Sequence, residues 1–207
     1  KGKGELRPAS VDIIPDRIEA ATYLLAGVIT QGDITVKGVI PEHLNALLAK
    51  LDEAGIEVIN SGNALRVANP RRPKGITLKT MPYPGFSTDL QPQMMSVLSL
   101  AEGTSIIHET IFESRFLHAS ELQKMGAQIE LQGNTAIVHG QKNLIGAEVY
   151  ATDLRGGAAL VLAGLAAEGE TVIYDTHHLR RGYEDMVEKL IPLGAQIREE
   201  VGEPQGK

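Results

Sequence analysis

The stretch DLRGGAALVLAGLAA, residues 153–167, is apolar on almost every side when it is wound as an α-helix. After the leading Asp153, its only charged side chain is Arg155, which falls in the first turn. A helix without a polar face is stable only when other elements cover it. Asp153 is a typical N-cap, because its carboxylate can accept hydrogen bonds from N–H groups of the first turn. We therefore expect a buried central helix that begins after Asp153.

Two other apolar runs follow an aspartate in the same way, IEAATYLLAGVI at 18–29 after Asp16 and LQPQMMSVLSLA at 90–101 after Asp89. Each of the three runs leads through a glycine into a strand-like segment, at 32–36, 103–107 and 169–173. A second, amphipathic helix follows each time, at 44–55, 118–126 and 184–194. A further strand comes after each of these helices, at 56–58, 127–129 and 195–197. The first two copies add a hairpin strand, at 64–67 and 135–138.

A recurring segment of this length is a supersecondary unit. We read it as β-α-β-α-β-β, with repeats at about 11–69, 75–140 and 147–201, of which the third lacks its last strand. Segments 1–10 and 202–207 are expected to lie outside this domain. The fold class is α/β, with three buried central helices surrounded by sheets, because helices without a polar face need such cover.

The composition restricts the chemistry and the partners. The 207 residues carry a net charge of -6, so no overall positive field draws in nucleic acid or an anionic membrane surface. Any bound anion must then be held by a local basic cluster. The chain has no cysteine, which excludes thiolate chemistry, and no apolar run reaches the ~20 residues of a membrane span. These features predict a cytoplasmic protein with no membrane and no nucleic-acid partner.

Five motifs carry a resemblance to a known family. They are PDRIEA at 15–20, PYPGFSTDLQPQM at 82–94, FESRFLHASELQKMGA at 112–127, ATDLRGGAALVLAGL at 151–165 and HLRRGYE at 178–184. Together they resemble the C-terminal half of the UDP-N-acetylglucosamine 1-carboxyvinyltransferases, which are enolpyruvyl transferases. The similarity runs from about Val11 to Ile197. The PYPGFSTD segment argues against the sister enzymes of the shikimate pathway.

The resemblance implies an inverse α/β barrel domain of three repeats. It also implies transfer of enolpyruvate from phosphoenolpyruvate to the 3'-hydroxyl of UDP-N-acetylglucosamine, with release of phosphate and without a cofactor, in peptidoglycan synthesis. In such enzymes an N-terminal half supplies a lysine and a mobile loop, and its first strands complete this domain. We therefore expect that half as a partner and almost no turnover from this chain alone. The alternative is a non-catalytic domain, or a fragment that still binds the sugar nucleotide.

Asp89 stands at the end of a bend that two prolines and a glycine at 82–85 stiffen. From spacing alone, Thr88 or Asp89 is a helix N-cap. The resemblance implies a second role, in which Asp89 is a catalytic residue that binds the attacking hydroxyl of the sugar. A carboxylate there can take the hydroxyl proton as the new bond forms, an effect of roughly 10²- to 10⁴-fold on the rate. The aspartates of the other two repeats are expected to be caps.

Three arginines and two apolar residues complete the candidate substrate site, namely Arg115, Arg155, Arg181, Ile111 and Phe112. Taken singly, an arginine is usually a solvated surface group, and an apolar residue after a strand usually packs. The resemblance implies that the arginines surround phosphoenolpyruvate, whose carboxylate and phosphate suit the guanidinium fork. It also implies that the backbone of Ile111 holds the sugar nucleotide and that Phe112 forms a wall of the same pocket.

The remaining histidines and basic residues indicate no further site. His118, His177 and His178 lack the spacing and the acidic partner of a metal site. The segment RRPK at 71–74 has no interleaved aromatic residues, so a solvated loop is favoured over nucleic-acid binding.

Two positions depart from the family pattern. Ser87 stands where a proline is usual, which is expected to loosen the bend. Arg180 stands where an acidic residue is usual, which removes a local partner of Arg181 and leaves its orientation open. Neither change removes a group that the chemistry requires.

Overall fold

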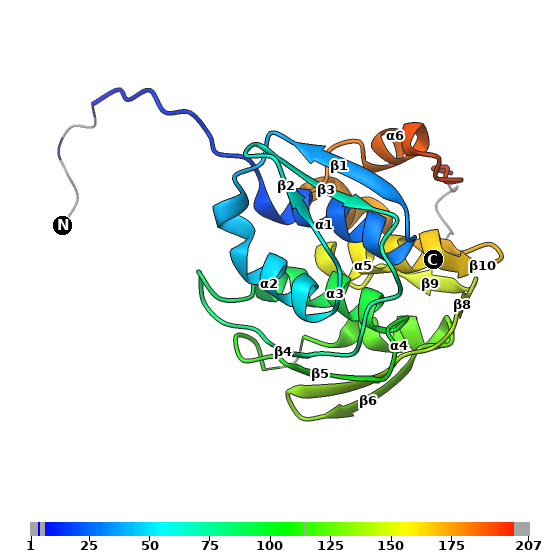
Figure 1. Cartoon of the computed structure of the whole chain (residues 1–207). Coiled ribbons are helices and arrows are strands. Elements are labelled where there is room, and N and C mark those ends of the chain that lie inside the picture. The colour runs from blue at the N-terminus through cyan, green and yellow to red at the C-terminus, as the bar shows by residue number, and fades with distance from the viewer. Residues whose placement is uncertain (1–3, 5–6, 114, 201–207) are drawn as a thin grey trace.

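Three helices lie together in the middle of the molecule, α1 (Arg17–Ile29), α3 (Gln91–Leu98) and α5 (Leu154–Ala166) (Figure 1). The structure is a computed structural model that describes residue 4, residues 7–113 and residues 115–200. Every residue of α3 is buried, as is most of α5, and both helices contact α1. The prediction of three buried central helices is confirmed. The physical reason is that each helix presents apolar side chains on nearly all sides.

A three-stranded antiparallel sheet covers these helices on one side (Figure 1). Its strands, in the order β1-β3-β2, are β1 (Asp33–Lys37), β3 (Ala64–Ala68) and β2 (Ile59–Asn60). The connection from β1 to β2 contains a 3₁₀ turn and a helix, η1 (Pro41–Leu44) and α2 (Asn45–Glu53). Leu65 and Val67 of β3 are buried while Arg66 is exposed, which is the alternation of a strand with one face in water.

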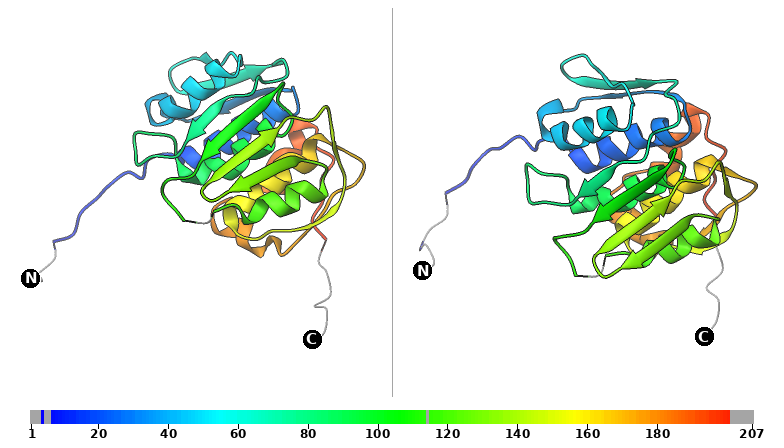
Figure 2. Two further views of the ribbon diagram at one scale, coloured as in Figure 1. Left: turned by 90° about the horizontal axis from the view of Figure 1, so that it is seen from below. Right: turned by 60° about the horizontal axis from the view of Figure 1, so that its bottom comes forward.

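A four-stranded sheet, green in Figures 1 and 2, covers another side of the helices. Its strands, in the order β4-β5-β7-β6, are β4 (Thr77–Lys79), β5 (Thr104–His108), β7 (Thr135–His139) and β6 (Gln128–Gln132). β4 pairs in parallel with β5, and the other two pairings are antiparallel. This repeat also contains η2 (Thr88–Leu90) and α4 (Leu117–Lys124). It has the full β-α-β-α-β-β order that the sequence predicts.

On the third side, the described residues form two short parallel ladders. Their strands are β8 (Leu144–Ile145) with β10 (Ala167–Glu168), and β9 (Glu148–Tyr150) with β11 (Val172–Tyr174). Three short helical elements follow, η3 (Thr176–Arg181), α6 (Met186–Leu190) and η4 (Ile191–Leu193). Residues 175–200 contain no strand, so the third repeat lacks its hairpin altogether rather than one strand.

Two predicted strands are wrong, and a third begins three residues later than predicted. Residues 11–16 would open the first repeat, yet they form no strand, and the chain before α1 leads away from the body of the molecule (Figure 2). The strand predicted at 56–58 begins only at Ile59, and residues 195–197 form none. A strand exists only where a neighbour pairs with it, and periodicity alone does not reveal that neighbour. The predicted end at 201 and the segment 202–207 lie outside the described residues.

Two glycines mark equivalent places in the second and third repeats. A side chain at Gly75 would come within 2.4 Å of the Thr104 carbonyl oxygen, and one at Gly146 within 2.2 Å of the Glu170 carbonyl oxygen. In both repeats the glycine precedes the first strand and touches the backbone beside the second strand. Only a residue without Cβ allows this approach.

Candidate active site

The bend before α3 closes on itself through its backbone. The N–H of Met81 donates to the Phe86 carbonyl at 2.9 Å, and the N–H of Gly85 donates to the Pro82 carbonyl at 2.8 Å. A side chain at Gly85 would lie 2.5 Å from Cβ of Met81, so the bend has room only for glycine there. The bend therefore fixes the position of residues 87–89 immediately before α3.

The aspartates of the three repeats do not have the same role. Asp16 accepts hydrogen bonds from N–H groups of the first turn of α1, and Asp153 does the same for α5. The prediction that these two are caps is confirmed. In the second repeat Ser87 is the N-cap, because its hydroxyl accepts from the N–H of Asp89 at 3.2 Å. The capping alternative for Thr88 and Asp89 is wrong, since both lie inside the 3₁₀ turn that Ser87 begins.

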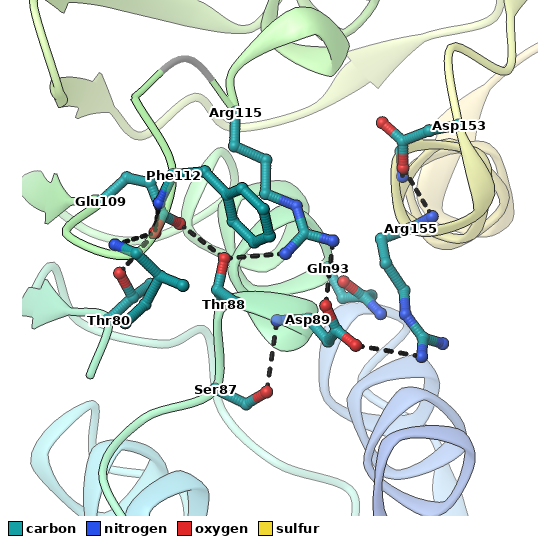
Figure 3. Close-up of polar contacts among 12 residues, drawn as sticks. Thr80, Ser87, Thr88, Asp89, Gln93, Glu109, Phe112, Arg115, Asp153 and Arg155 are labelled. Atoms are coloured by element: carbon teal, nitrogen blue, oxygen red, sulfur yellow. Dashed lines mark hydrogen bonds and ion pairs between the residues drawn. The ribbon is translucent and has the colours of Figure 1, made fainter. Parts of the chain in front are cut away.

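The carboxylate of Asp89 lies between two guanidinium groups (Figure 3). Oδ1 is 2.9 Å from Nη2 of Arg115, which comes from the loop before α4. Oδ2 is 3.2 Å from Nη2 of Arg155, in the first turn of α5. The arginine side chains are 20% and 12% exposed and that of Asp89 is 38% exposed, so the aspartate faces the solvent side of the group. The second and third repeats thus contribute to one charged cluster, which forms only because η2, the loop before α4 and the start of α5 pack together.

A hollow of about 450 Å³ lies over this cluster. Its lining consists of Asp89, Phe112, Arg115, Thr152, Asp153, Leu154, Arg155, His178 and Arg181. The structure therefore brings together five of the six residues that the sequence singled out. The sixth, Ile111, is outside this lining and 39% exposed. Its backbone N–H donates to Oε1 of Glu109 at 2.9 Å, so a ligand would meet the Ile111 backbone at its carbonyl.

The side chain of Arg181 is exposed and forms no hydrogen bond or ion pair with residues 7–113 or 115–200. Its neighbour Arg180 pairs with Glu199, whereas Arg181 lines the hollow. Three guanidinium groups therefore face one hollow that contains two carboxylates, and one of these, Asp153, caps α5. The cluster has a local positive excess in a chain with net charge -6, which suits an anionic ligand.

A buried polar network lies beneath Arg155. Nη1 of Arg155 donates to the Tyr183 hydroxyl at 3.3 Å, and Nε2 of Gln93 donates to the same oxygen at 3.1 Å. The Tyr183 hydroxyl is also 3.0 Å from Oγ1 of Thr22. Thr22, Gln93 and Arg155 come from α1, α3 and α5, so the network joins all three central helices under the site. Thr22, Gln93 and Tyr183 were missed. For Thr22 and Gln93, a polar side chain in an almost wholly apolar helix is the signal that could have found them.

A second network holds Arg115 from the other side (Figure 3). Nη1 of Arg115 donates to the Thr88 hydroxyl at 2.8 Å, and that hydroxyl donates to Oε2 of Glu109 at 2.9 Å. The guanidinium carbon of Arg115 also lies 4.8 Å from the centre of the Phe112 ring. Glu109 was missed as well. The sequence does contain a signal for it. Side chains of a strand alternate between two faces, so Glu109 lies on the same face as the buried Ser105 and Ile107, and a charged residue is unusual on a buried face.

His118 is fully buried next to the first turn of α5, and its Cβ lies 3.3 Å from the place that a side chain at Gly156 would take. Burial lowers the pKa of His118 to about 4, because the apolar surroundings disfavour the imidazolium. The charge of Asp153 opposes this shift and that of Arg115 adds to it. The imidazole is therefore neutral at pH 7.

No three His, Asp or Glu side chains come together as a metal site in residues 7–113 and 115–200. No helix in the same part of the chain is long and apolar enough to cross a bilayer.

The solvated-loop interpretation of 71–74 is wrong for Arg72. Its guanidinium donates to the carbonyls of Leu100, Ala101 and Gln141, which stabilises the chain just after α3.

These features define an enolpyruvyl transferase domain. A family model described as EPSP synthase (3-phosphoshikimate 1-carboxyvinyltransferase) matches residues 1–190, so the chain belongs to this family. The enolpyruvyl transferase NikO from Streptomyces tendae has the same fold at a TM-score of 0.84 and 33% identity, over 91% of this chain and 45% of its own. The inverse α/β barrel that the sequence predicts is confirmed. An EPSP synthase from Acinetobacter baumannii, 20% identical with a TM-score of 0.63, shares the fold.

Within the family, the chain is similar to enzymes named UDP-N-acetylglucosamine 1-carboxyvinyltransferase, and the resemblance to them is confirmed. One from Symbiobacterium thermophilum is 55% identical over 97% of this chain and 47% of its own length. One from Trichlorobacter lovleyi is 53% identical over 99% of this chain and 48% of its own. The chain thus spans about half the length of the curated relatives it matches.

Proposed function

We propose that this chain is half of a cytoplasmic enzyme that transfers enolpyruvate from phosphoenolpyruvate to the 3'-hydroxyl of UDP-N-acetylglucosamine in peptidoglycan biosynthesis. The observation that carries the proposal is the carboxylate of Asp89, held by two arginines over a hollow, in a chain 55% identical to a relative of that name. We also propose that residues 11–201 form one domain, with repeats at about 11–69, 75–140 and 147–201.

Asp89 would act as the general base. In the first step the hydroxyl oxygen of the sugar bonds to C2 of phosphoenolpyruvate, and Asp89 accepts the hydroxyl proton. A group of the other half would protonate C3, which gives a tetrahedral adduct. Phosphate then leaves with the electrons of its bond to C2, and C3 loses a proton to restore the double bond. The carboxylate of Asp89 supports this role because it lines the hollow and caps no helix.

Arg115, Arg155 and Arg181 would bind phosphoenolpyruvate. Its carboxylate and phosphate can replace the Asp89 carboxylate as partners of the guanidinium groups, since all are planar or multivalent oxygen anions. Each contact passed to the substrate leaves an oxygen of Asp89 available to the sugar hydroxyl. The same donors would stabilise the departing phosphate, at about 3 kcal/mol for one well-placed donor. Phe112 and the carbonyl of Ile111 would contact the sugar nucleotide.

The other half of the enzyme is proposed as the partner of this chain. Relatives about twice as long support it, as does the third repeat, whose β11 pairs with β9 alone in the described part of the chain. An unpaired sheet edge is a ready place for strand addition. Closure of two halves over the hollow would exclude water from the reactive adduct.

Phosphate release from phosphoenolpyruvate and UDP-N-acetylglucosamine tests the proposal. The chain alone is expected to release almost none, and the chain mixed with a separately produced N-terminal half of a relative should release it at a measurable rate. Shikimate 3-phosphate in place of the sugar nucleotide should give none. Phosphate release by the chain alone would refute the proposal that the site is divided between two halves. Faster release with shikimate 3-phosphate would refute the proposal that UDP-N-acetylglucosamine is the acceptor.

The second candidate is a domain that binds the sugar nucleotide without turnover, which the half-length coverage favours. Titration calorimetry of the chain with UDP-N-acetylglucosamine distinguishes it. Binding by this chain together with an inactive mixture would support the second candidate over the first.

A further inference from the structure

Glu109 is a buried carboxylate that does not line the hollow. It is 1% exposed and follows β5 directly. Oε1 accepts hydrogen bonds from the Thr80 hydroxyl at 2.7 Å and from the N–H groups of Ile111 and Phe112 at 2.9 and 3.3 Å. Oε2 accepts from the Thr88 hydroxyl at 2.9 Å. A buried carboxylate is tolerated only when it is well hydrogen-bonded, and here all the donors are neutral.

These four bonds connect three separate parts of the second repeat. Thr80 follows β4, Thr88 belongs to η2 beside Asp89, and residues 111–112 begin the loop that leads to Arg115. The Thr80 hydroxyl also accepts from the N–H of Thr110 at 2.8 Å, which holds the same loop against β4. One side chain therefore sets the mutual position of the base and of the loop that bears an anion-binding residue.

The bond to Thr88 also determines which way that hydroxyl points. A hydroxyl has one proton to donate and two lone pairs to accept. Because the proton of Thr88 is directed to Glu109, a lone pair is directed to Nη1 of Arg115 at 2.8 Å. Nη2 of the same guanidinium reaches Asp89 (Figure 3). The contacts thus run from Glu109 through Thr88 to Arg115 and Asp89.

We propose that Glu109 is a positioning residue, which orients Arg115 toward Asp89 through the Thr88 hydroxyl and holds the backbone at 111–112, before any ligand arrives. Arg115 would otherwise be a long side chain with several accessible rotamers, and ordering it beforehand removes that cost from substrate binding. The effect on catalysis rests on the proposed function, whereas the effect on Arg115 does not.

Two substitutions cut this link in different ways. Glu109→Gln keeps the size of the side chain but can place an N–H donor toward Thr88, which then must accept from both position 109 and Arg115. Thr88→Val keeps the shape of the side chain and removes the hydroxyl. Glu102→Gln is the matched control, because it removes the charge of an exposed glutamate near the other end of β5.

The first measurement uses the chain alone, labelled with ¹⁵N-arginine, and follows the guanidinium signals by NMR. In the wild type and in Glu102→Gln, the Nη signals of Arg115 should be distinct, because hydrogen bonds restrict rotation. In Glu109→Gln and in Thr88→Val they should merge, while those of Arg155 stay distinct, and the double variant should resemble Thr88→Val. Unchanged Arg115 signals in either variant would overturn the proposal. So would merging of the Arg155 signals to the same extent, which would indicate general loosening.

The second measurement uses the chain mixed with the other half. Thr88→Val, which cuts only the link to Arg115, should raise KM for phosphoenolpyruvate about tenfold or more and leave KM for the sugar nucleotide nearly unchanged, since misplacement of a positioned group by about 1 Å costs on the order of 10²-fold. Glu109→Gln should raise both KM values, because Ile111 and Phe112 also lose their acceptor. Equal rises in both KM values for Thr88→Val would contradict a role through Arg115. If the wild-type mixture is inactive, the proposed function fails, but the NMR result still decides the role of Glu109. If Glu109→Gln does not fold, Thr88→Val carries both measurements.

Discussion

Asp153 and Asp89 stand at the start of neighbouring buried helices, yet their carboxylates have different partners. Asp153 has an extended backbone, and its carboxylate accepts from the N–H groups of Arg155 and Gly156. In the second repeat it is Ser87 that has the extended backbone, with φ -67° and ψ 131°. Asp89 lies two residues further on, inside a 3₁₀ turn, where its carboxylate pairs with arginines instead. A shift of two residues in the start of a helix thus releases an aspartate from capping and places it in a binding site.

The largest expected difference between the two positions is in catalysis. Asp89→Asn should lower kcat of the reconstituted enzyme by roughly 10²- to 10⁴-fold, because an amide cannot accept the hydroxyl proton. The melting temperature should change little, since partly exposed ion pairs contribute little to stability. Phosphate release and thermal unfolding measure the two effects.

Asp16→Asn is the control for this variant. Asn also caps helices, so the first helix should keep its N-cap and kcat should change far less than in Asp89→Asn. Similar losses of kcat in the two variants would contradict the assignment of Asp89 as a general base and of Asp16 as a helix cap.

The next largest effect is the pH dependence that His118 confers on stability. Its pKa is about 4 in the folded chain and near 6.5 when unfolded, so between these values the unfolded state binds more protons. The contribution of the neutral imidazole to the free energy of unfolding is fully present above pH 6.5 and is lost as the pH falls to about 4. At 1.36 kcal/mol per pKa unit, the loss is about 3 kcal/mol.

Denaturant unfolding at pH 7 and at pH 4 measures this effect. His118→Leu, which removes the titrating group, should lose about 3 kcal/mol less than the wild type over that interval. Parallel pH profiles of the two proteins would mean that the imidazole titrates alike in the folded and unfolded states.

Loss of a cap should have a smaller effect. Asp153→Ala removes the acceptor of two N–H groups and is expected to lower the free energy of unfolding by about 1 kcal/mol. Asp89→Ala should lower it less, because no helix N–H group bonds to that side chain in the described structure. Equilibrium unfolding in urea compares the two variants. A larger loss of unfolding free energy in Asp89→Ala would contradict the assignment of Asp153, rather than Asp89, as a helix cap.

The smallest effect concerns the cap of the second repeat. Ser87→Ala removes a single hydrogen bond to the N–H of Asp89 and should cost about 0.5 kcal/mol. Ser87→Pro should recover part of this loss, since φ is already -67° and a proline restricts the unfolded chain. If Ser87→Pro is less stable than Ser87→Ala in urea, proline does not fit this bend.

Much of the site could be predicted because its residues lie in specific motifs. Asp89, Phe112, Arg115, Arg155 and Arg181 were all named from the sequence, and they line one hollow. The residues that hold them in place were not predicted in that role: Glu109 and Tyr183 were not named, and Thr88 was named only as a cap. Glu109, Thr88 and Tyr183 act through bonds to side chains far along the chain, and spacing in one segment gives no information about such partners.

The strands show the same division. The strands named for the second repeat, at 103–107, 127–129 and 135–138, all form, because they pair with one another. The first and third repeats have patterns nearly as regular, but residues 11–16 and 195–197 form no strand. Strand formation depends on a neighbouring edge, which is a property of the whole assembly of elements.

The local structure follows from the sequence alone, namely three helices too apolar to be exposed and the caps at Asp16 and Asp153. These follow from contacts within a few residues, which a periodic pattern records. The packing of the repeats places Asp89 between two arginines and connects Glu109 to one of them through Thr88. Those contacts depend on distances between segments that are remote in the chain. For Glu109 they also depend on burial, because a buried carboxylate needs hydrogen-bond donors.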